Sequence, residues 1–369
     1  MNVLLLVPDG VSVRNFLLTG LASRCADSGN VDVLLGAGLS DYEGTHQAGI
    51  RHFDALLPYP ERVIEASTRR TLEYAHLRWC DTAGTRFNLD APISGSNRSR
   101  AIRGMAKALS RGFATEQRLP WLVRVHDAMA DRRKEVDRYV EMIKAWEIDV
   151  ILCAHQRPTN ILPVVLAAKR LSIPTATFIF SWDNLSTKGR IAAPFDHYFV
   201  WSDQMAEELL RFYPDVGSDR THVVGSPQFE PYSDASLVWS RERFHDELGL
   251  DPDRPTICFS GGDTGTCPED PEHLRILCEL IRDGDIAGNP QVVLRPAPVD
   301  TSDRYDDVLH EFPVVLSRPL WHDLGGGWES VVPTPNDIEL LVNLTKYADL
   351  NVNMASTMTL DFSLHDTPV

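Results

Sequence analysis

The chain has 369 residues, 43% apolar and 24% charged, with a formal net charge of −16. At about 150 residues per domain, this length predicts two domains that each bury a core. Nucleic acid is an unlikely ligand for so acidic a chain, because phosphate backbones need a basic surface. No stretch reaches the roughly 18 apolar residues of a membrane span, and Pro8 interrupts the only N-terminal apolar run. We therefore expect a cytoplasmic protein.

The first half of the chain alternates between short apolar runs and helical spacing. Residues 3–7 are apolar without alternation and end at Pro8-Asp9-Gly10, which is typical of a buried parallel strand. Helical spacing follows over 11–26, then a strand at 31–35. The pattern resumes with strands at 149–154, 175–180, 197–201 and 222–224 and helices at 161–171 and 204–212. This βα order predicts a Rossmann-like first domain, 1–225.

A long stretch, about 61–147, interrupts this domain and reads as a helical insertion. Within it, residues 98–144 contain twelve Lys or Arg and six Asp or Glu, a basic segment in an acidic chain. A solvated helical face explains this charge most simply. The alternative is a basic surface that meets an anionic acceptor or makes a peripheral contact with the inner face of the membrane.

The second half repeats the alternation after a polar connection that begins at 225–227 and continues to Ser240. Strands are expected at 256–260, 291–295, 314–316 and 349–354, with helices at 271–283 and 337–347. These elements predict a second Rossmann-like domain, 241–369. The strand-like residues 367–369 have no helix after them to cover the sheet. We therefore expect the second domain to be incomplete, either in a longer protein or with a partner on this edge.

In open α/β sheets, ligands bind outside the carboxyl ends of the strands. In the second domain this rule selects Gly261, Gly262 and Thr264 after one strand and Arg295 after the next. Ser356 and Thr357 follow a third strand at an expected helix start, where amides and hydroxyls favour an anion. Each feature also has an ordinary explanation, namely a turn, a surface ion pair and a helix cap. Together they predict a phosphate site.

Three segments resemble bacterial proteins of one superfamily. Residues 345–369, with Ser356-Thr357 and the final Thr-Pro-Val, resemble the donor-binding segment of GT-B glycosyltransferases. Residues 222–229 are similar to their interdomain hinge, and 178–190 to members that build surface carbohydrates. The resemblance implies an α/β fold with two Rossmann-like domains in series.

It also implies transfer of a sugar from a nucleotide-sugar donor to a surface-polysaccharide or glycolipid acceptor, with no metal or other cofactor. One residue departs from the pattern. Relatives that use cytidine nucleotides often carry Arg-Pro-His-Pro, whereas this chain has Ala297 at the histidine position. The nucleotide is therefore left open.

If the transfer inverts the anomeric centre, its base would lie at a strand end of the first domain. Asp183, His155 and Asp9 meet this condition, although each could equally serve a turn or a loop hydrogen bond. A retaining transfer needs no such base, and the sequence leaves the stereochemistry open. Two other functions fit the same fold. One is a nucleotide-sugar 2-epimerase or a transferase of the CDP-glycerol type, and the other is a non-catalytic protein that binds a nucleotide sugar.

Overall fold

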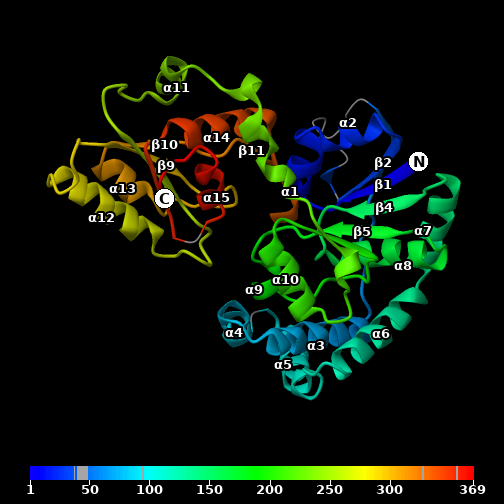
Figure 1. The fold of residues 1–369 in the computed structure, drawn as a ribbon. Coiled ribbons are helices and arrows are strands. Elements are labelled where there is room, and N and C mark those ends of the chain that lie inside the picture. Colours follow the sequence, from blue (N-terminus) through cyan, green and yellow to red (C-terminus); the bar gives the residue numbers. More distant parts are fainter. Residues whose placement is uncertain (37, 40–48, 94, 326–327, 355) are drawn as a thin grey trace. The chain divides into compact units, whose positions relative to one another are not determined.

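The computed structural model describes residues 1–36, 38–39, 49–93, 95–325, 328–354 and 356–369. These residues form two compact units, Met1–Ser226 and Pro227–Val369, each with its own parallel sheet (Figure 1). The two units are described separately below. No helix among the described residues is both long and apolar enough to cross a membrane.

The first unit contains a seven-stranded sheet in the order β3-β2-β1-β4-β5-β6-β7, with every neighbouring pair parallel. The strands are β1 (Asn2–Val7), β2 (Asn30–Leu35), β3 (Ile50–Ala55), β4 (Val150–Cys153), β5 (Thr175–Phe178), β6 (His197–Val200) and β7 (Thr221–Val223). The strand order reverses direction between β1 and β4. This reversal is the switch point at which open α/β sheets bind ligands.

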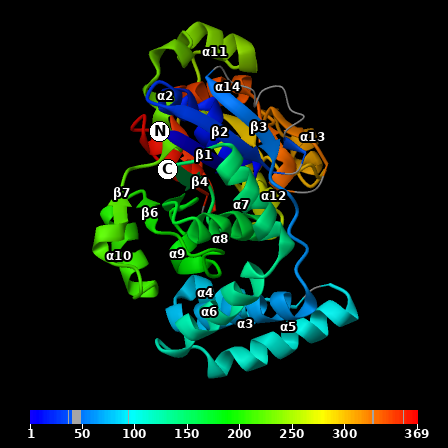
Figure 2. The same ribbon diagram turned by 90° about the vertical axis from the view of Figure 1, so that its right-hand side faces the viewer.

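The helices of the first unit include an insertion between β3 and β4, visible in Figure 2 as the group α3 to α6. The insertion comprises α3 (Val63–Cys80), α4 (Ala83–Asp90), α5 (Asn97–Leu109), α6 (Arg118–Asp131) and α7 (Lys134–Ala145). Apart from three short 3-10 helices, the other helices described in this unit are α1 (Gly10–Ser12), the π-helix Val13–Leu18, α2 (Leu21–Ala26), α8 (Leu162–Arg170), α9 (Asn184–Thr187) and α10 (Asp203–Phe212).

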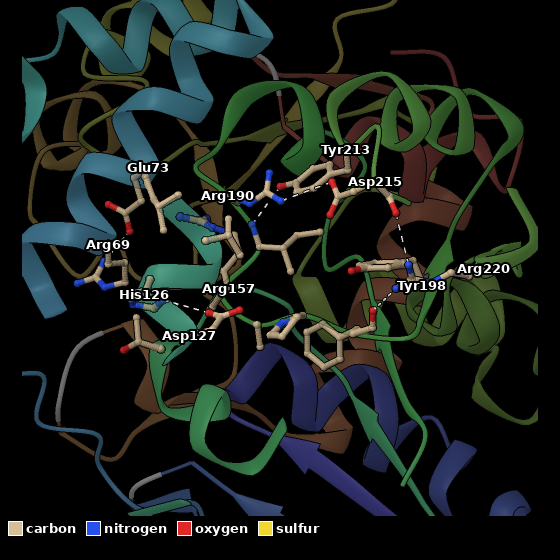
Figure 3. Close-up of a pocket in the computed structure, with 18 residues that line it drawn as sticks. Arg69, Glu73, His126, Asp127, Arg157, Arg190, Tyr198, Tyr213, Asp215 and Arg220 are labelled. Atoms are coloured by element: carbon tan, nitrogen blue, oxygen red, sulfur yellow. Dashed lines mark hydrogen bonds and ion pairs between the residues drawn. The ribbon is translucent and has the colours of Figure 1, made fainter. Parts of the chain in front are cut away.

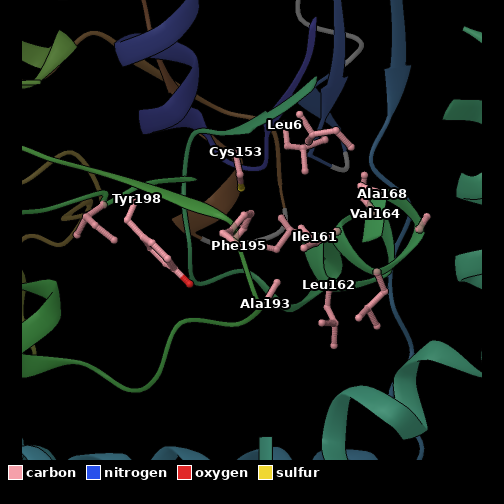
Figure 4. Packing of buried hydrophobic residues seen from close by; sticks show 14 of the residues in the cluster. Leu6, Cys153, Ile161, Leu162, Val164, Ala168, Ala193, Phe195 and Tyr198 are labelled. Atoms are coloured by element: carbon pink, nitrogen blue, oxygen red, sulfur yellow. The ribbon is translucent and has the colours of Figure 1, made fainter. Parts of the chain in front are cut away.

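The core of the first unit follows from the apolar strands. Leu4 and Leu6 point to the same face of β1, because side chains alternate along a strand, and both are fully buried. They belong to one cluster with Ile143 of α7 and with Val164 and other residues of α8; Figure 4 shows part of it. Burying each such side chain contributes about 1.5–3 kcal/mol, which anchors α7 and α8 to this face.

The second unit contains the four-stranded parallel sheet β10-β9-β8-β13 and a separate antiparallel hairpin. Its strands are β8 (Thr256–Ser260), β9 (Gln291–Arg295), β10 (Val314–Leu316), β13 (Leu350–Val352), and the hairpin strands β11 (Trp321–Asp323) and β12 (Val331–Pro333). Its α-helices are α11 (Arg241–Leu248), α12 (Asp270–Arg282), α13 (Asp306–Glu311), α14 (Pro335–Tyr347) and α15 (Met358–Ser363). The order reverses between β8 and β13, which gives this sheet its own switch point.

The structure confirms the α/β class and the two Rossmann-like sheets, and it corrects several details. The expected helix over 11–26 is broken at Gly20, whose φ of 76° is left-handed and ends the π-helix before α2 begins. Strand β3 and the hairpin β11–β12 are absent from the sequence prediction. Residues 227–240, most of the expected connection, belong to the second unit, and Trp239 is buried in its core.

The end of the chain lies beside β13. The backbone N–H of Asn351 donates to the carbonyl of Pro368 at 2.9 Å, and the hydroxyl of Thr367 donates to the carbonyl of Thr345 at 2.8 Å. Pro368 is thus hydrogen-bonded to β13, but residues 367–369, expected to be strand-like, are not assigned as a strand.

Candidate active site

Two of the three predicted catalytic residues meet at the switch point of the first sheet. Asp9 follows β1, His155 follows β4, and these two strands are neighbours. The Nδ1 atom of His155 lies 2.6 Å from Oδ2 of Asp9, and both side chains are buried. A carboxylate can only accept, so the proton of this hydrogen bond belongs to Nδ1. Asp9 therefore orients the imidazole ring and selects its tautomer.

Local sequence explains why Asp9 is held rigidly. The apolar strand β1 ends at Pro8, and Asp9 keeps an extended backbone (φ −150°, ψ 169°) as the N-cap of α1. Its Oδ1 accepts from the backbone N–H of Ser12 at 2.9 Å, and its Oδ2 accepts from the Ser12 hydroxyl at 3.1 Å. The same carboxylate thus caps a helix and orients a histidine.

The other nitrogen of the His155 ring, Nε2, is buried and has no hydrogen-bond partner among the described residues. The ring stacks on Phe180, which follows β5, with centroids 3.9 Å apart and planes 17° apart. An imidazole fixed on one nitrogen by a carboxylate and unpaired on the other is an arrangement suited to a general base.

Asp183 stands in a different environment. Its carboxylate accepts from the hydroxyls of Ser181 at 2.7 Å and Thr187 at 2.9 Å, and from the amide of Asn184 at 3.2 Å. Partial burial opposes ionisation, but these hydrogen bonds and the charge of Lys188 outweigh it and lower the pKa of Asp183. A carboxylate so satisfied is a weak base, and it organises the loop that carries α9.

The second sheet brings Ser260 and Asn351 together at its own switch point. Ser260 ends β8, Asn351 lies in β13, and the Ser260 hydroxyl donates to Oδ1 of Asn351 at 2.6 Å. The Nδ2 of Asn351 is buried without a partner among the described residues. Gly261 and Gly262 continue from β8, and Ser356 and Thr357 follow β13, so this edge collects most of the residues predicted to bind the donor.

The glycine loop is more internally bonded than its sequence indicates. The backbone N–H of Gly261 donates to the carbonyl of Arg295 at 2.9 Å, and that of Gly262 donates to Oδ2 of Asp270 at 2.7 Å. A Cβ at Gly261 would collide with the hydroxyl of Tyr305, so this glycine also serves close packing. These two amides are not free to cradle a phosphate as the loop stands. The exposed Thr264 has no hydrogen bond among the described residues.

Arg295 lies inside the second unit instead of at an open surface. It is 5% exposed, and its Nη2 pairs with both carboxylate oxygens of Asp337 at 2.9 and 3.0 Å. Asp337 also accepts from the indole N–H of Trp321 at 2.7 Å. The Nη1 of Arg295 is buried and without a partner among the described residues. Nη2 of the guanidinium is therefore engaged within the fold, and Nη1 is still available to donate to a ligand.

The two hydroxyl residues after β13 differ in their contacts. The Ser356 hydroxyl accepts from the backbone N–H of Met358 at 3.2 Å. The backbone N–H of Ser356 donates to Oδ1 of Asn353 at 2.9 Å. Thr357 directly precedes α15 but makes no side-chain capping bond. Its hydroxyl is therefore the freer of the two for an added ligand.

The sequence did not point to Phe180 or Ser12 as parts of the site. The sequence contains only weak indications of their roles. Phe180 comes two residues after the end of β5, and Ser12 lies three residues after Asp9 in a capping pattern. Neither residue type is distinctive enough for chemistry to identify it before the strand order is known.

These two sheets, each with a switch point, define a protein of the GT-B fold class, built from two Rossmann-like domains. No family model and no curated protein matches the chain. Solved structures share the fold across its full length. UDP-N-acetylglucosamine 2-epimerase from Rickettsia bellii matches with a TM-score of 0.52 at 11% identity, over 100% of this chain and 78% of that one. MnaA from S. aureus, solved with UDP, matches with a TM-score of 0.51 at 10% identity over the same shares. At these identities the likeness establishes the fold alone.

Proposed function

We propose that this protein is an enzyme that acts on a UDP-linked sugar, and that it inverts the sugar at C2. The fold supports the nucleotide sugar, because the Rickettsia bellii structure is of a UDP-N-acetylglucosamine 2-epimerase and the MnaA structure holds UDP. The observation that carries the proposal is the Asp9–His155 pair, with a free Nε2 at the switch point of the first sheet.

The chemistry needs what this pair supplies. In this reaction the electron pair of the broken C2–H bond forms a C1=C2 double bond and expels UDP from C1. A proton then adds to C2 on the opposite face and UDP adds back to C1, so substrate and product are isomers and no co-reactant is consumed. A neutral imidazole accepts the proton at Nε2, and Asp9 stabilises the imidazolium that results. The nucleotide would lie at the switch point of the second sheet, near Ser356, Thr357 and the free Nη1 of Arg295.

Glycosyl transfer remains the second candidate, because the segments at 345–369 and 178–190 resemble GT-B glycosyltransferases. An inverting transfer also uses a base, which removes the proton of an acceptor hydroxyl instead of a C–H proton. The two candidates therefore share His155 and differ in whether an acceptor is required.

The test is incubation with UDP-N-acetylglucosamine in D₂O without any acceptor, followed by NMR. We expect the C2 epimer to appear with deuterium at C2, and His155→Gln to abolish it. The matched control is His52→Gln, because Nδ1 of His52 also contacts a buried aspartate, Asp32, at 2.8 Å. If no epimer forms and UDP is released only when a carbohydrate acceptor is added, the protein is a transferase. Binding without any turnover would remove both proposals.

A further inference from the structure

The first unit contains a second cavity, separate in its residues from the Asp9–His155 pair. Its volume is about 110 Å³, which is several times the volume that a single water molecule needs. Its walls come from α3 and α6 of the helical insertion, from the segment after β4, and from the segments that precede β6 and β7 (Figure 3). Of the described residues, Asp9, His155 and Asp183 are not in its lining.

The cavity contains an arginine that makes no close ion pair with any described residue. Among its lining carboxylates, Glu73 pairs with Arg69 at 2.5 Å, and Asp215 lies 3.7 Å from Arg190. Arg157 has no hydrogen bond or ion pair among the described residues. Its side chain is exposed. Desolvation of part of the guanidinium lowers its pKa, and the more distant charges of Glu73 and Asp183 oppose this shift without cancelling it. An unpaired guanidinium that loses solvation gains from an oxyanion in its planar fork.

His126 supplies a second unpaired group of opposite character. It is 4% exposed, and its Nδ1 lies 3.3 Å from Oδ1 of Asp127, which can only accept. The proton is therefore on Nδ1, and the buried Nε2, which has no partner among the described residues, presents a lone pair. A lone pair here accepts a hydrogen bond from a hydroxyl and repels an oxyanion.

Rigid aromatic walls complete the cavity. Tyr198 and Phe195 are buried, and the buried Tyr213 is fixed by a hydrogen bond from the backbone N–H of Ile191 to its hydroxyl at 3.0 Å. Arg190 lies over the Tyr213 ring at 4.7 Å from its centroid, which keeps that guanidinium in place. The C–H faces of a sugar ring pack well on such surfaces.

We propose that this cavity binds a hydroxylated oxyanion of the sugar phosphate or sugar acid class. Arg157 pairs with the oxyanion, and Nε2 of His126 accepts a hydrogen bond from a hydroxyl of the same ligand. The proposal goes beyond the UDP-sugar reaction, and its test needs no turnover, so failure of one does not imply failure of the other.

The test is calorimetric titration of the whole chain with glucose 6-phosphate, glucuronate, inorganic phosphate and glucose. We expect one or both sugar anions to bind at least tenfold more tightly than phosphate or glucose. Arg157→Met should weaken that binding about tenfold or more, because it removes a charge-assisted hydrogen bond. Arg124→Met is the control, because Arg124 is an exposed arginine of α6 outside the cavity. Preference for glucuronate identifies a carboxylate ligand, and preference for glucose 6-phosphate identifies a phosphate ligand.

His126→Phe tests the contact to the ligand hydroxyl separately from the contact to the oxyanion. We expect it to reduce the affinity for the sugar anion to that for phosphate, and to leave the affinity for phosphate unchanged. If this buried substitution prevents folding, Arg157→Met still tests the proposal, because Arg157 is exposed and makes no hydrogen bond or ion pair among the described residues. Binding of glucose as tight as that of the sugar anions would overturn the proposal, as would no binding by any probe or equal affinity in Arg157→Met.

Discussion

The replacement Asp9→Asn tests the proposed base most directly, because it changes one charge and almost no volume. Asparagine caps helices as well as aspartate, so the contacts to Ser12 can persist and the fold should be retained. The substitution changes the partner of Nδ1 of His155, which lies 2.6 Å from a carboxylate oxygen of Asp9 in the unmodified protein. An amide NH₂ at this position would force Nδ1 to accept and would move the proton to Nε2, where it blocks the base.

The magnitude has two parts. A charge-assisted hydrogen bond of about 1.5–3 kcal/mol to the developing imidazolium corresponds to roughly a tenfold to hundredfold loss of rate. The wrong tautomer adds to this, and the corresponding change in a serine-protease triad lowers kcat by about 10⁴. We therefore expect a decrease of about 10²–10⁴ in the rate of deuterium incorporation at C2.

The assay compares this variant with Asp32→Asn under saturating substrate. Asp32 is also fully buried and also contacts a histidine and an arginine, but it lies within β2 and away from the switch point. Asp32→Asn should cost stability with little change in kcat, whereas Asp9→Asn should do the opposite. Equal losses of kcat in the two variants, or full activity in Asp9→Asn, would show that the Asp9–His155 contact is structural.

Three further outcomes follow from the structure. Asp183→Asn should lower the free energy of unfolding by about 2 kcal/mol at pH 7, measured with urea. Because folding lowers the pKa of Asp183, this difference should disappear as the pH falls below about 4. Ser356→Ala with Thr357→Ala should weaken UDP binding about tenfold by calorimetry. If the basic segment contacts a membrane, Arg98→Glu with Arg103→Glu should reduce sedimentation with anionic vesicles, and more strongly at low salt.

Each of these has a contrary result. A pH-independent difference in stability would mean that the Asp183 charge does not contribute to folding. For UDP binding, the control is Ser363→Ala, which changes an exposed hydroxyl at the far end of α15. Affinity that is unchanged in the double variant, or equally weakened in the control, would remove the phosphate site from this helix. No sedimentation of the unmodified chain with anionic vesicles would leave the basic segment as a solvated helical face.

The sequence predicted the buried strands well because they are apolar on both faces. Strands β8 and β9 begin and end at the predicted residues, and all of their residues are buried. Strand β3, in contrast, is a polar edge strand, and its side chains at Arg51 and His52 pair with the buried Asp32 of β2. The stability of β3 depends on its pairing with β2, which local periodicity does not reveal, so the sequence alone does not predict this strand.

The candidate site was predictable in part for the same reason. Strand ends identified Asp9 and His155 separately, although they lie 146 residues apart in the chain. Only the strand order, with β1 beside β4, makes them a pair. The contacts within the fold that compete with a ligand for the predicted binding groups were not predictable either. Gly262 already donates to Asp270, and Arg295 already pairs with Asp337, because groups at a buried strand end must be satisfied within the fold.

The three predicted bases now differ in a way that bears on the reaction. Asp9 and Asp183 have their oxygens engaged, and of the three only His155 keeps an unpaired acceptor among the described residues. Transfer needs one base, whereas inversion at C2 must also return a proton to the opposite face. The His155 ring is fixed on one face of the sugar, so it performs both steps only if the unsaturated intermediate turns over in the site, and the epimer would then retain part of the original hydrogen. A second acid that exchanges with solvent would instead give full deuterium at C2. The deuterium content of the C2 epimer therefore reports whether His155 acts alone.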